Sequence, residues 1–251
     1  MRRYPEGVVI TQRDRAIFGE IFENRVMYGT QLSHLHFRGL ARQRASRRLC
    51  KLEKIGYLDR RYVYGPHESA HAAYSLTPKA LKAIAETYRH KITREFIKSD
   101  SVAHDLVLVE VRRRLERLKL VTRYYTENML QACAEFSENE ALWPFVQNNT
   151  DAVLEVTRQG TKTLVALEYE NSEKAQERYT RKLVSYYSDA RTPAVFYVCG
   201  NARIRAAVAQ AEAAVGGRGP ARCFYALLED VLGKSPSCTF TDRKGAKIVL
   251  S

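Results

Sequence analysis

Hydrophobic residues recur at helical spacing in two segments near the start of the chain. The first segment carries an apolar stripe made of Ile17, Phe18, Ile21 and Phe22. This stripe predicts a helix from about Thr11 to Asn24, in which Thr11 is the N-cap and Asp14 completes a capping box. In the second segment, Leu32 and Leu35 predict a short helix from about Thr30 to His36. Each helix can bury one face in a small core.

A third amphipathic segment lies within residues 38–54, RGLARQRASRRLCKLEK, and its two faces differ in chemistry. The apolar positions are Ala45, Leu49 and Leu52, and Gly56 follows as a C-terminal stop. The polar positions are Gln43, Arg44, Arg47 and Lys51. The pattern predicts a helix over Arg42–Lys54 that packs its apolar face into the core and leaves its basic face outside.

Two strand-like runs follow the third helix, at Tyr57–Tyr64 and Ala70–Leu76, and a turn at residues 65–69 joins them. Three helices and then a hairpin, with the phrases LEKIGYLDRR and YSLTPKAL, resemble the winged helix-turn-helix domains of bacterial transcription regulators. The resemblance implies that the third helix enters a DNA major groove. It also implies that the wing, with His67 near its tip, approaches the backbone. A solvated turn residue is the alternative reading of His67.

Arginine, lysine, glutamine and serine side chains supply the donors that read phosphates and base edges. The candidate DNA-binding residues are Arg38, Arg42, Gln43, Arg44, Ser46, Arg47, Arg48, Lys51 and His67. A solvated basic surface helix would have a similar composition, so the helix alone leaves both interpretations open.

The second half of the chain alternates helical and strand-like patterns. After a helix at about Pro78–Tyr88, the predicted order is α-β-β-β-α-β-α-β. The expected ranges are helix 102–118, strand 121–127, an irregular stretch 129–149, strands 151–157 and 162–169, helix 173–188, strand 194–199, helix 202–215 and a last core strand 222–228. The sequence therefore predicts an α/β (α+β) protein with one domain over residues 1–90 and another over 99–251.

Net charge also differs between the two predicted domains. Residues 1–98 hold 20 basic and 9 acidic side chains, a net charge of +11, whereas residues 99–251 hold 21 and 19, a net charge of +2. A basic module joined to a nearly neutral one is typical of nucleic-acid-binding proteins. A membrane-surface helix would also be basic, but it would need an aromatic apolar face, and the only tryptophan is Trp143.

Composition also indicates the cellular compartment in which the protein works. The chain has no apolar stretch long enough to span a membrane, and its first residues, MRRYPEGVV, lack the apolar core of an export signal. The five cysteines are scattered and form no C-x-x-C pair, which favours reduced thiols and argues against a zinc site. We therefore expect a cytoplasmic protein without membrane contact and, outside the magnesium case below, without a cofactor.

Carboxylates stand at the ends of two predicted strands in the second half. The order of elements, with Asp151 opening one strand and Glu168 and Glu170 ending the next, resembles the PD-(D/E)xK restriction-endonuclease-like fold. That resemblance implies that Asp151 and Glu168, with Glu170, would bind Mg²⁺ in an active nuclease. A lysine usually stands where Glu170 lies, and Lys174 is the nearby candidate to reach back. Solvated strand ends, or the remnant of a lost site, are the alternatives.

Taken whole, the chain from about Thr11 to Phe240 resembles the plasmid replication-relaxation family, which includes mobilisation accessory proteins. The similarity rests on the winged-helix portion, then SVAHDLVLVEVRRRLE, TDAVLEV, VALEYENSEKAQERYTRKLVSYYSD and AVFYVC. It implies a sequence-specific double-stranded DNA-binding protein, acting as a transcriptional regulator or an origin-binding accessory protein. A Mg²⁺-dependent endonuclease and a structural relaxosome component that contacts a relaxase are the alternatives. We expect a homodimer, because two-fold operators match two-fold proteins.

Overall fold

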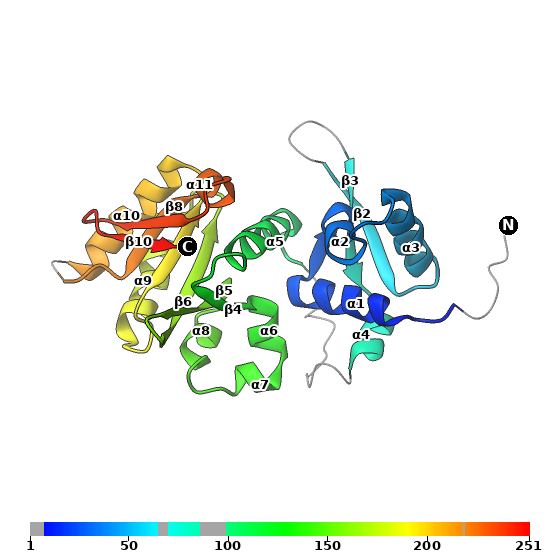
Figure 1. The fold of residues 1–251 in the computed structure, drawn as a ribbon. Coiled ribbons are helices and arrows are strands. Elements are labelled where there is room, and N and C mark those ends of the chain that lie inside the picture. The colour runs from blue at the N-terminus through cyan, green and yellow to red at the C-terminus, as the bar shows by residue number, and fades with distance from the viewer. Residues whose placement is uncertain (1–7, 65–69, 86–98, 218) are drawn as a thin grey trace. The chain divides into compact units, whose positions relative to one another are not determined.

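A computed structural model describes residues 8–64, 70–85, 99–217 and 219–251 (Figure 1). The chain divides into two compact units, residues 1–106 and 107–251. The division lies inside one helix, α5 (Val102–Leu115), whose first residues belong to unit 1 and whose later residues belong to unit 2. Each unit is described separately below.

Unit 1 contains the predicted three helices and hairpin. The helices are α1 (Gln12–Asn24), α2 (Gly29–His36), α3 (Arg42–Lys54) and α4 (Pro78–Ile84), and the strands are β1 (Val26–Tyr28), β2 (Leu58–Tyr64) and β3 (Ala70–Leu76). The strands form an antiparallel sheet in the order β1-β3-β2. The order of three helices followed by two paired strands agrees with the elements predicted from the sequence. Strand β1 was not predicted, because three residues show no periodicity.

Local sequence explains where these helices begin and end. The Thr11 side chain accepts a hydrogen bond from the backbone N–H of Asp14, and the Asp14 carboxylate accepts one from the backbone N–H of Thr11, so the predicted capping box is present. Thr77 caps α4, and Pro78 occupies its first turn, where no backbone donor is needed. Gly56 follows α3 with φ +78°, a conformation that glycine adopts without strain.

Unit 2 is built on one mixed sheet of seven strands. The strands are β4 (Val121–Thr126), β5 (Ala152–Arg158), β6 (Thr161–Glu170), β7 (Val195–Cys199), β8 (Cys223–Leu227), β9 (Cys238–Asp242) and β10 (Lys247–Leu250). Their order is β10-β9-β8-β7-β6-β5-β4. Pairing is parallel from β6 through β7 to β8 and antiparallel elsewhere. The parallel strands form the centre, where both faces are covered.

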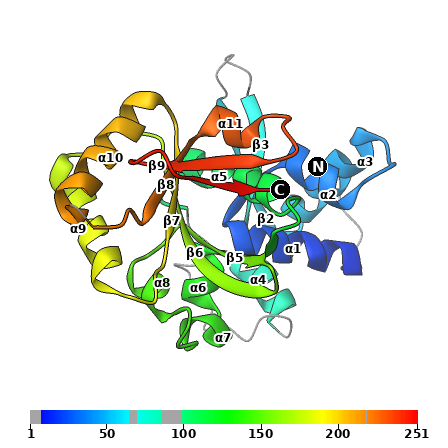
Figure 2. The same cartoon turned by 60° about the vertical axis from the view of Figure 1, so that its left-hand side comes forward.

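Helices lie on both faces of this sheet (Figure 2). On one face, Leu167, Phe196 and Phe240 pack in a core with Val111 of α5 and Val231 of α11 (Leu228–Leu232). The other face carries α9 (Gln176–Ser188) and α10 (Ala202–Gly216). This arrangement agrees with the predicted order of a leading helix, three strands and two further αβ repeats.

Two details of the sequence-based prediction were wrong. Residues 129–149 are not irregular, since α6 (Glu127–Ala132), α7 (Ala134–Ser137) and α8 (Trp143–Gln147) lie there. These helices span four to six residues each, which is too short for a periodic signal. Strand β8 is not the last, because α11 and the hairpin β9–β10 follow it.

None of the helices in the described part of the chain is long and apolar enough to cross a bilayer.

Candidate nucleic-acid interface

Helix α3 is held in place by its apolar face. Ala45, Leu49 and Leu52 are each at most 1% exposed. On the opposite side Gln43, Arg44, Ser46 and Arg47 are exposed, and Lys51 is half-buried. Within the described ranges no acidic side chain forms an ion pair with Arg44 or Arg47. The helix therefore presents arginine, glutamine and serine donors from a rigid support.

Arg48 has a different position from its neighbours. Its guanidinium forms an ion pair with Asp14 of α1, where Nε lies 2.8 Å from Oδ1, and it also donates to the carbonyl of Val9 at 3.0 Å. The Asp14 side chain is fully buried. Burial alone would raise the pKa of Asp14, but hydrogen bonds from Arg48 and Thr11 lower it below the ordinary value. Arg48 thus joins α3 to α1, and its guanidinium is occupied by contacts within unit 1.

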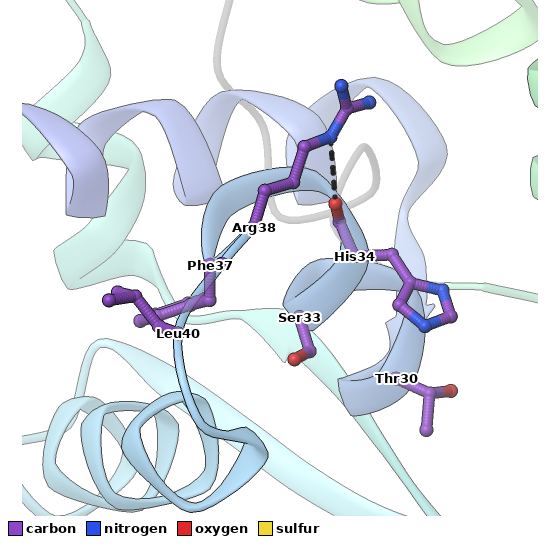
Figure 3. A pocket seen from close by; sticks show the side chains of 7 residues that line it. Thr30, Ser33, His34, Phe37, Arg38 and Leu40 are labelled. Atoms are coloured by element: carbon purple, nitrogen blue, oxygen red, sulfur yellow. Dashed lines mark hydrogen bonds between the residues drawn. The ribbon is translucent and has the colours of Figure 1, made fainter.

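Of the remaining candidates, Arg38 lies between α2 and α3. The Nε of Arg38 donates to the carbonyl of His34 at 3.2 Å, so Arg38 extends from the end of α2 (Figure 3). It borders a hollow of about 520 Å³ that Thr30, Ser33 and Phe37 also line. The side chain of Arg42 and the whole of His67 lie outside the described residues.

A second hollow lies between α2, α3 and β3. It has a volume of about 140 Å³, and Thr30 and Ser33 line it as well as the first. Ser46 of α3 and Ala70 and Ala72 of β3 complete its lining. The two hollows make the surface beside α3 concave along α2, from the residues before α3 to the hairpin.

The hairpin face that carries Tyr62 and Tyr64 was not among the contacts predicted from the sequence. Tyr62 and Tyr64 of β2 are 58% and 76% exposed. The alternation in LDRRYVY was visible, but it could not show which face of the hairpin packs inward. On the opposite face, Val63 packs against a cluster that contains Val26, Ala73 and Leu106, whereas Asp59 and Arg61 are exposed.

In unit 2, Glu168 lies near the end of β6 and is 4% exposed. The hydroxyl of Tyr186 donates to its Oε1, and Nζ of Lys182 lies 3.1 Å from the same oxygen. Lys182 also donates to the carbonyls of Asn148 and Asn149, at 2.8 and 3.0 Å. Nuclease-like proteins usually carry a lysine two residues after this glutamate, where this chain has Glu170. Here the lysine next to Glu168 is Lys182 of α9. The sequence did not indicate this because the two residues are 14 positions apart.

Burial raises the pKa of Glu168 to about 7, and the Asp151 carboxylate adds to this increase, whereas Lys182 and the Tyr186 hydroxyl act against it. Burial would lower the pKa of Lys182, but the negative charges of Glu168 and Asp151 raise it above its usual value. Glu168 and Asp151 therefore lie close enough to raise each other's energy as anions, and the positive charge of Lys182 acts on both.

The acidic residues do not fit the magnesium site that the nuclease resemblance implies. One oxygen of Asp151 accepts the backbone N–H of Tyr169 at 2.7 Å, and Glu170 forms an ion pair with Lys174 at 2.7 Å. In the described ranges, no group of three or more His, Cys, Asp or Glu side chains could hold a metal ion. Mg²⁺ requires carboxylate oxygens that are open to it and to its waters, and Glu168 is buried under a tyrosine and a lysine.

The family model described as replication-relaxation matches residues 18–194, more than half of the chain. The protein belongs to the replication-relaxation family. This membership associates it with replication or mobilisation of plasmids or other mobile elements. Neither the curated proteins nor the solved structures contain a significant match, so the likeness of unit 2 to endonucleases stays a prediction from the sequence.

Proposed function

We propose that the protein binds double-stranded DNA in a sequence-specific manner through the exposed face of α3, as a regulator or origin-binding accessory protein of a mobile element. One observation carries the proposal. Arg44 and Arg47 are exposed on a helix whose opposite face is buried, and no described carboxylate neutralises them. Such residues can form bidentate hydrogen bonds to guanine or meet phosphates.

The electrostatics of α3 also favour an anionic ligand. Its first turn contains no acidic residue, and its N-cap, Ala41, provides no side-chain hydrogen bond. The N-terminus of a helix carries partial positive charge, so arginines in this turn are unfavourable for the isolated protein. DNA phosphates would offset this repulsion and satisfy free backbone donors. The arrangement is unfavourable in the free protein, which supports the proposal that α3 binds an anionic ligand.

A mobility-shift assay with fragments of the host plasmid or mobile element tests the proposal. We expect Arg44→Ala or Arg47→Ala to weaken binding by about 1–3 kcal/mol where the side chain reads a base, and to relax specificity at that base pair. An arginine that meets only phosphate would weaken all sequences alike and reduce the salt dependence.

Arg158→Ala is the matched control, because Arg158 is an exposed arginine in unit 2. Unchanged affinity in both α3 variants would refute the interface. The positions of the selected sites separate the two roles, since a regulator should select promoters and an accessory protein should select a transfer or replication origin.

We also propose that the protein acts as a homodimer. A single helix in the groove contacts few base pairs, and two-fold proteins read palindromic sites with half-sites about one helical turn apart. Sedimentation at micromolar concentration, with and without DNA, would detect the dimer. A monomer in both conditions would contradict the proposal.

For unit 2 we propose a structural role, in dimerisation or in contact with a relaxase or another mobilisation protein. The burial of Glu168 and its bonds to Lys182 and Tyr186 support this role over cleavage. Incubating plasmid DNA with the protein in Mg²⁺ and in EDTA tests it. Intact DNA in both conditions is expected, whereas metal-dependent cutting that disappears in Asp151→Ala would establish the endonuclease alternative. Co-purification with a relaxase would favour the relaxosome component.

A further inference from the structure

We infer that the hairpin face beside α3 is a stacking platform for unpaired DNA bases, formed by Tyr62 and Tyr64. The inference rests on the proposed DNA binding of unit 1 but concerns a different form of DNA. It predicts that the protein holds an opened or single-stranded segment in addition to a duplex site.

The two tyrosines are exposed on one face of one strand. They are 58% and 76% exposed and lie two positions apart on β2, so their Cα atoms are separated by roughly 7 Å. Their partners across the antiparallel pair are Ala72 and Ala70. Directly paired residues share a face of the sheet, and alanine is too short to cover a ring. The hairpin therefore presents two exposed aromatic rings beside short alanine side chains.

The platform is fixed to the proposed interface. Arg60 precedes Tyr62 on the same face, and its guanidinium lies 5.4 Å from the centre of the Tyr62 ring. The Nε of Arg60 forms an ion pair with Glu53 of α3 at 3.1 Å. The 140 Å³ hollow lined by Ala70, Ala72 and Ser46 lies between this face and α2. The tyrosines thus lie next to α3, and β2 packs against that helix in Figure 1.

Charge and chemistry identify the ligand as a nucleic acid with free base faces. Residues 1–98 carry a net charge of +11, which suits a polyanion and not an apolar peptide. In a duplex the bases stack at a rise of 3.4 Å, so their faces are hidden. Exposed aromatic rings beside arginines are the combination by which proteins bind single strands, since every base offers a face for stacking. Large exposed rings are unfavourable in water and gain most from such a contact.

Fluorescence anisotropy with a labelled single strand, and with the same sequence as a duplex, tests the platform. We expect Tyr62→Ala and Tyr64→Ala each to weaken single-strand binding roughly 5- to 150-fold, the range for loss of one stacked base. Duplex affinity should stay unchanged. Tyr62→Phe and Tyr64→Phe should keep single-strand binding, because stacking needs the ring and not the hydroxyl.

Trp143→Ala is the control, since Trp143 is a 45% exposed aromatic side chain in unit 2. Three results would overturn the inference: no single-strand binding by the wild type, equal losses for both forms of DNA, or Phe variants as weak as the Ala variants. The last would indicate hydroxyl contacts to phosphate.

The duplex measurements separate this inference from the proposed function. Tyrosine-dependent single-strand binding without duplex binding would refute the α3 interface and support the platform. Duplex binding that depends on Arg44 and Arg47, with no effect of the tyrosines on either form of DNA, would support the interface and refute the platform.

Discussion

Replacing Arg48 by alanine should destabilise unit 1 without any DNA present. The change leaves Asp14 with its side chain fully buried and removes two hydrogen bonds to its carboxylate. Breaking a buried ion pair by removing one partner costs about 3–5 kcal/mol. Arg48 itself is 22% exposed, so water can partly replace it, and we expect about 3 kcal/mol, the lower end of that range.

Urea and thermal denaturation followed by circular dichroism measure this loss. For a unit of this size, about 1 kcal/mol shifts the Tm by about 4–8 °C, so a decrease of roughly 12 °C or more is expected for the transition of unit 1. Arg44→Ala and Arg47→Ala on the same helix are the matched controls and should change the Tm little. A double variant with Asp14→Ala should lose less stability than the sum of the two single variants.

Acid should weaken the same pair. The pKa of Asp14 is lower in the folded than in the unfolded protein, so the stability it contributes is present above its unfolded pKa and is lost as the pH falls through the folded one. Arg48→Ala should remove this acid sensitivity. If Arg48→Ala were as mild as Arg44→Ala at neutral pH, the assignment of Arg48 to the interior of unit 1 would be wrong.

Unit 2 gives three further predictions. Glu168 has a folded pKa of about 7, above its unfolded value. The free energy of unfolding of the wild type should therefore decrease as the pH rises from about 4.5 to 7, by up to about 3 kcal/mol. Glu168→Gln should abolish that decrease in urea midpoints, and a pH-independent wild type would refute the assignment. The Asn201 side chain caps α10 by accepting a hydrogen bond from the backbone N–H of Ile204 at 3.0 Å, so Asn201→Ala should lower the free energy of unfolding by about 1 kcal/mol. Asn201→Asp should restore the wild-type stability, because aspartate caps helices equally well. Tyr225→Phe removes a 2.8 Å hydrogen bond to the buried Glu212 and should cost about 1.5–3 kcal/mol by denaturant titration, and an unchanged midpoint would contradict that bond.

The sequence predicted most of the elements because their patterns are local. The capping box of α1, the apolar face of α3 and the boundary between the strands predicted at 151–157 and 162–169 are each encoded within a few residues, and a tight turn lies at that boundary. That turn places Gln159 and Gly160 at φ +50° and +79°, as a two-residue hairpin requires. Such signals do not depend on distant parts of the chain.

Contacts between distant residues could not be predicted in this way. Arg44, Arg47 and Arg48 are the same residue type on one helix, and only the packing of α1 shows that Arg48 meets a carboxylate 34 positions away. The position of Lys182 beside Glu168 likewise depends on how α9 lies on the sheet. Which residues of the arginine-rich helix are available to a ligand is therefore a property of the tertiary structure.

The pairing of Arg48 with Asp14 has an evolutionary consequence. The two positions contribute to one interior contact, so a change at one should be tolerated mainly with a compensating change at the other. Arg44 and Arg47 face outward and are free of that constraint. We therefore expect positions 14 and 48 to co-vary among members of the family, while positions 44 and 47 diverge between lineages as their recognition sites diverge.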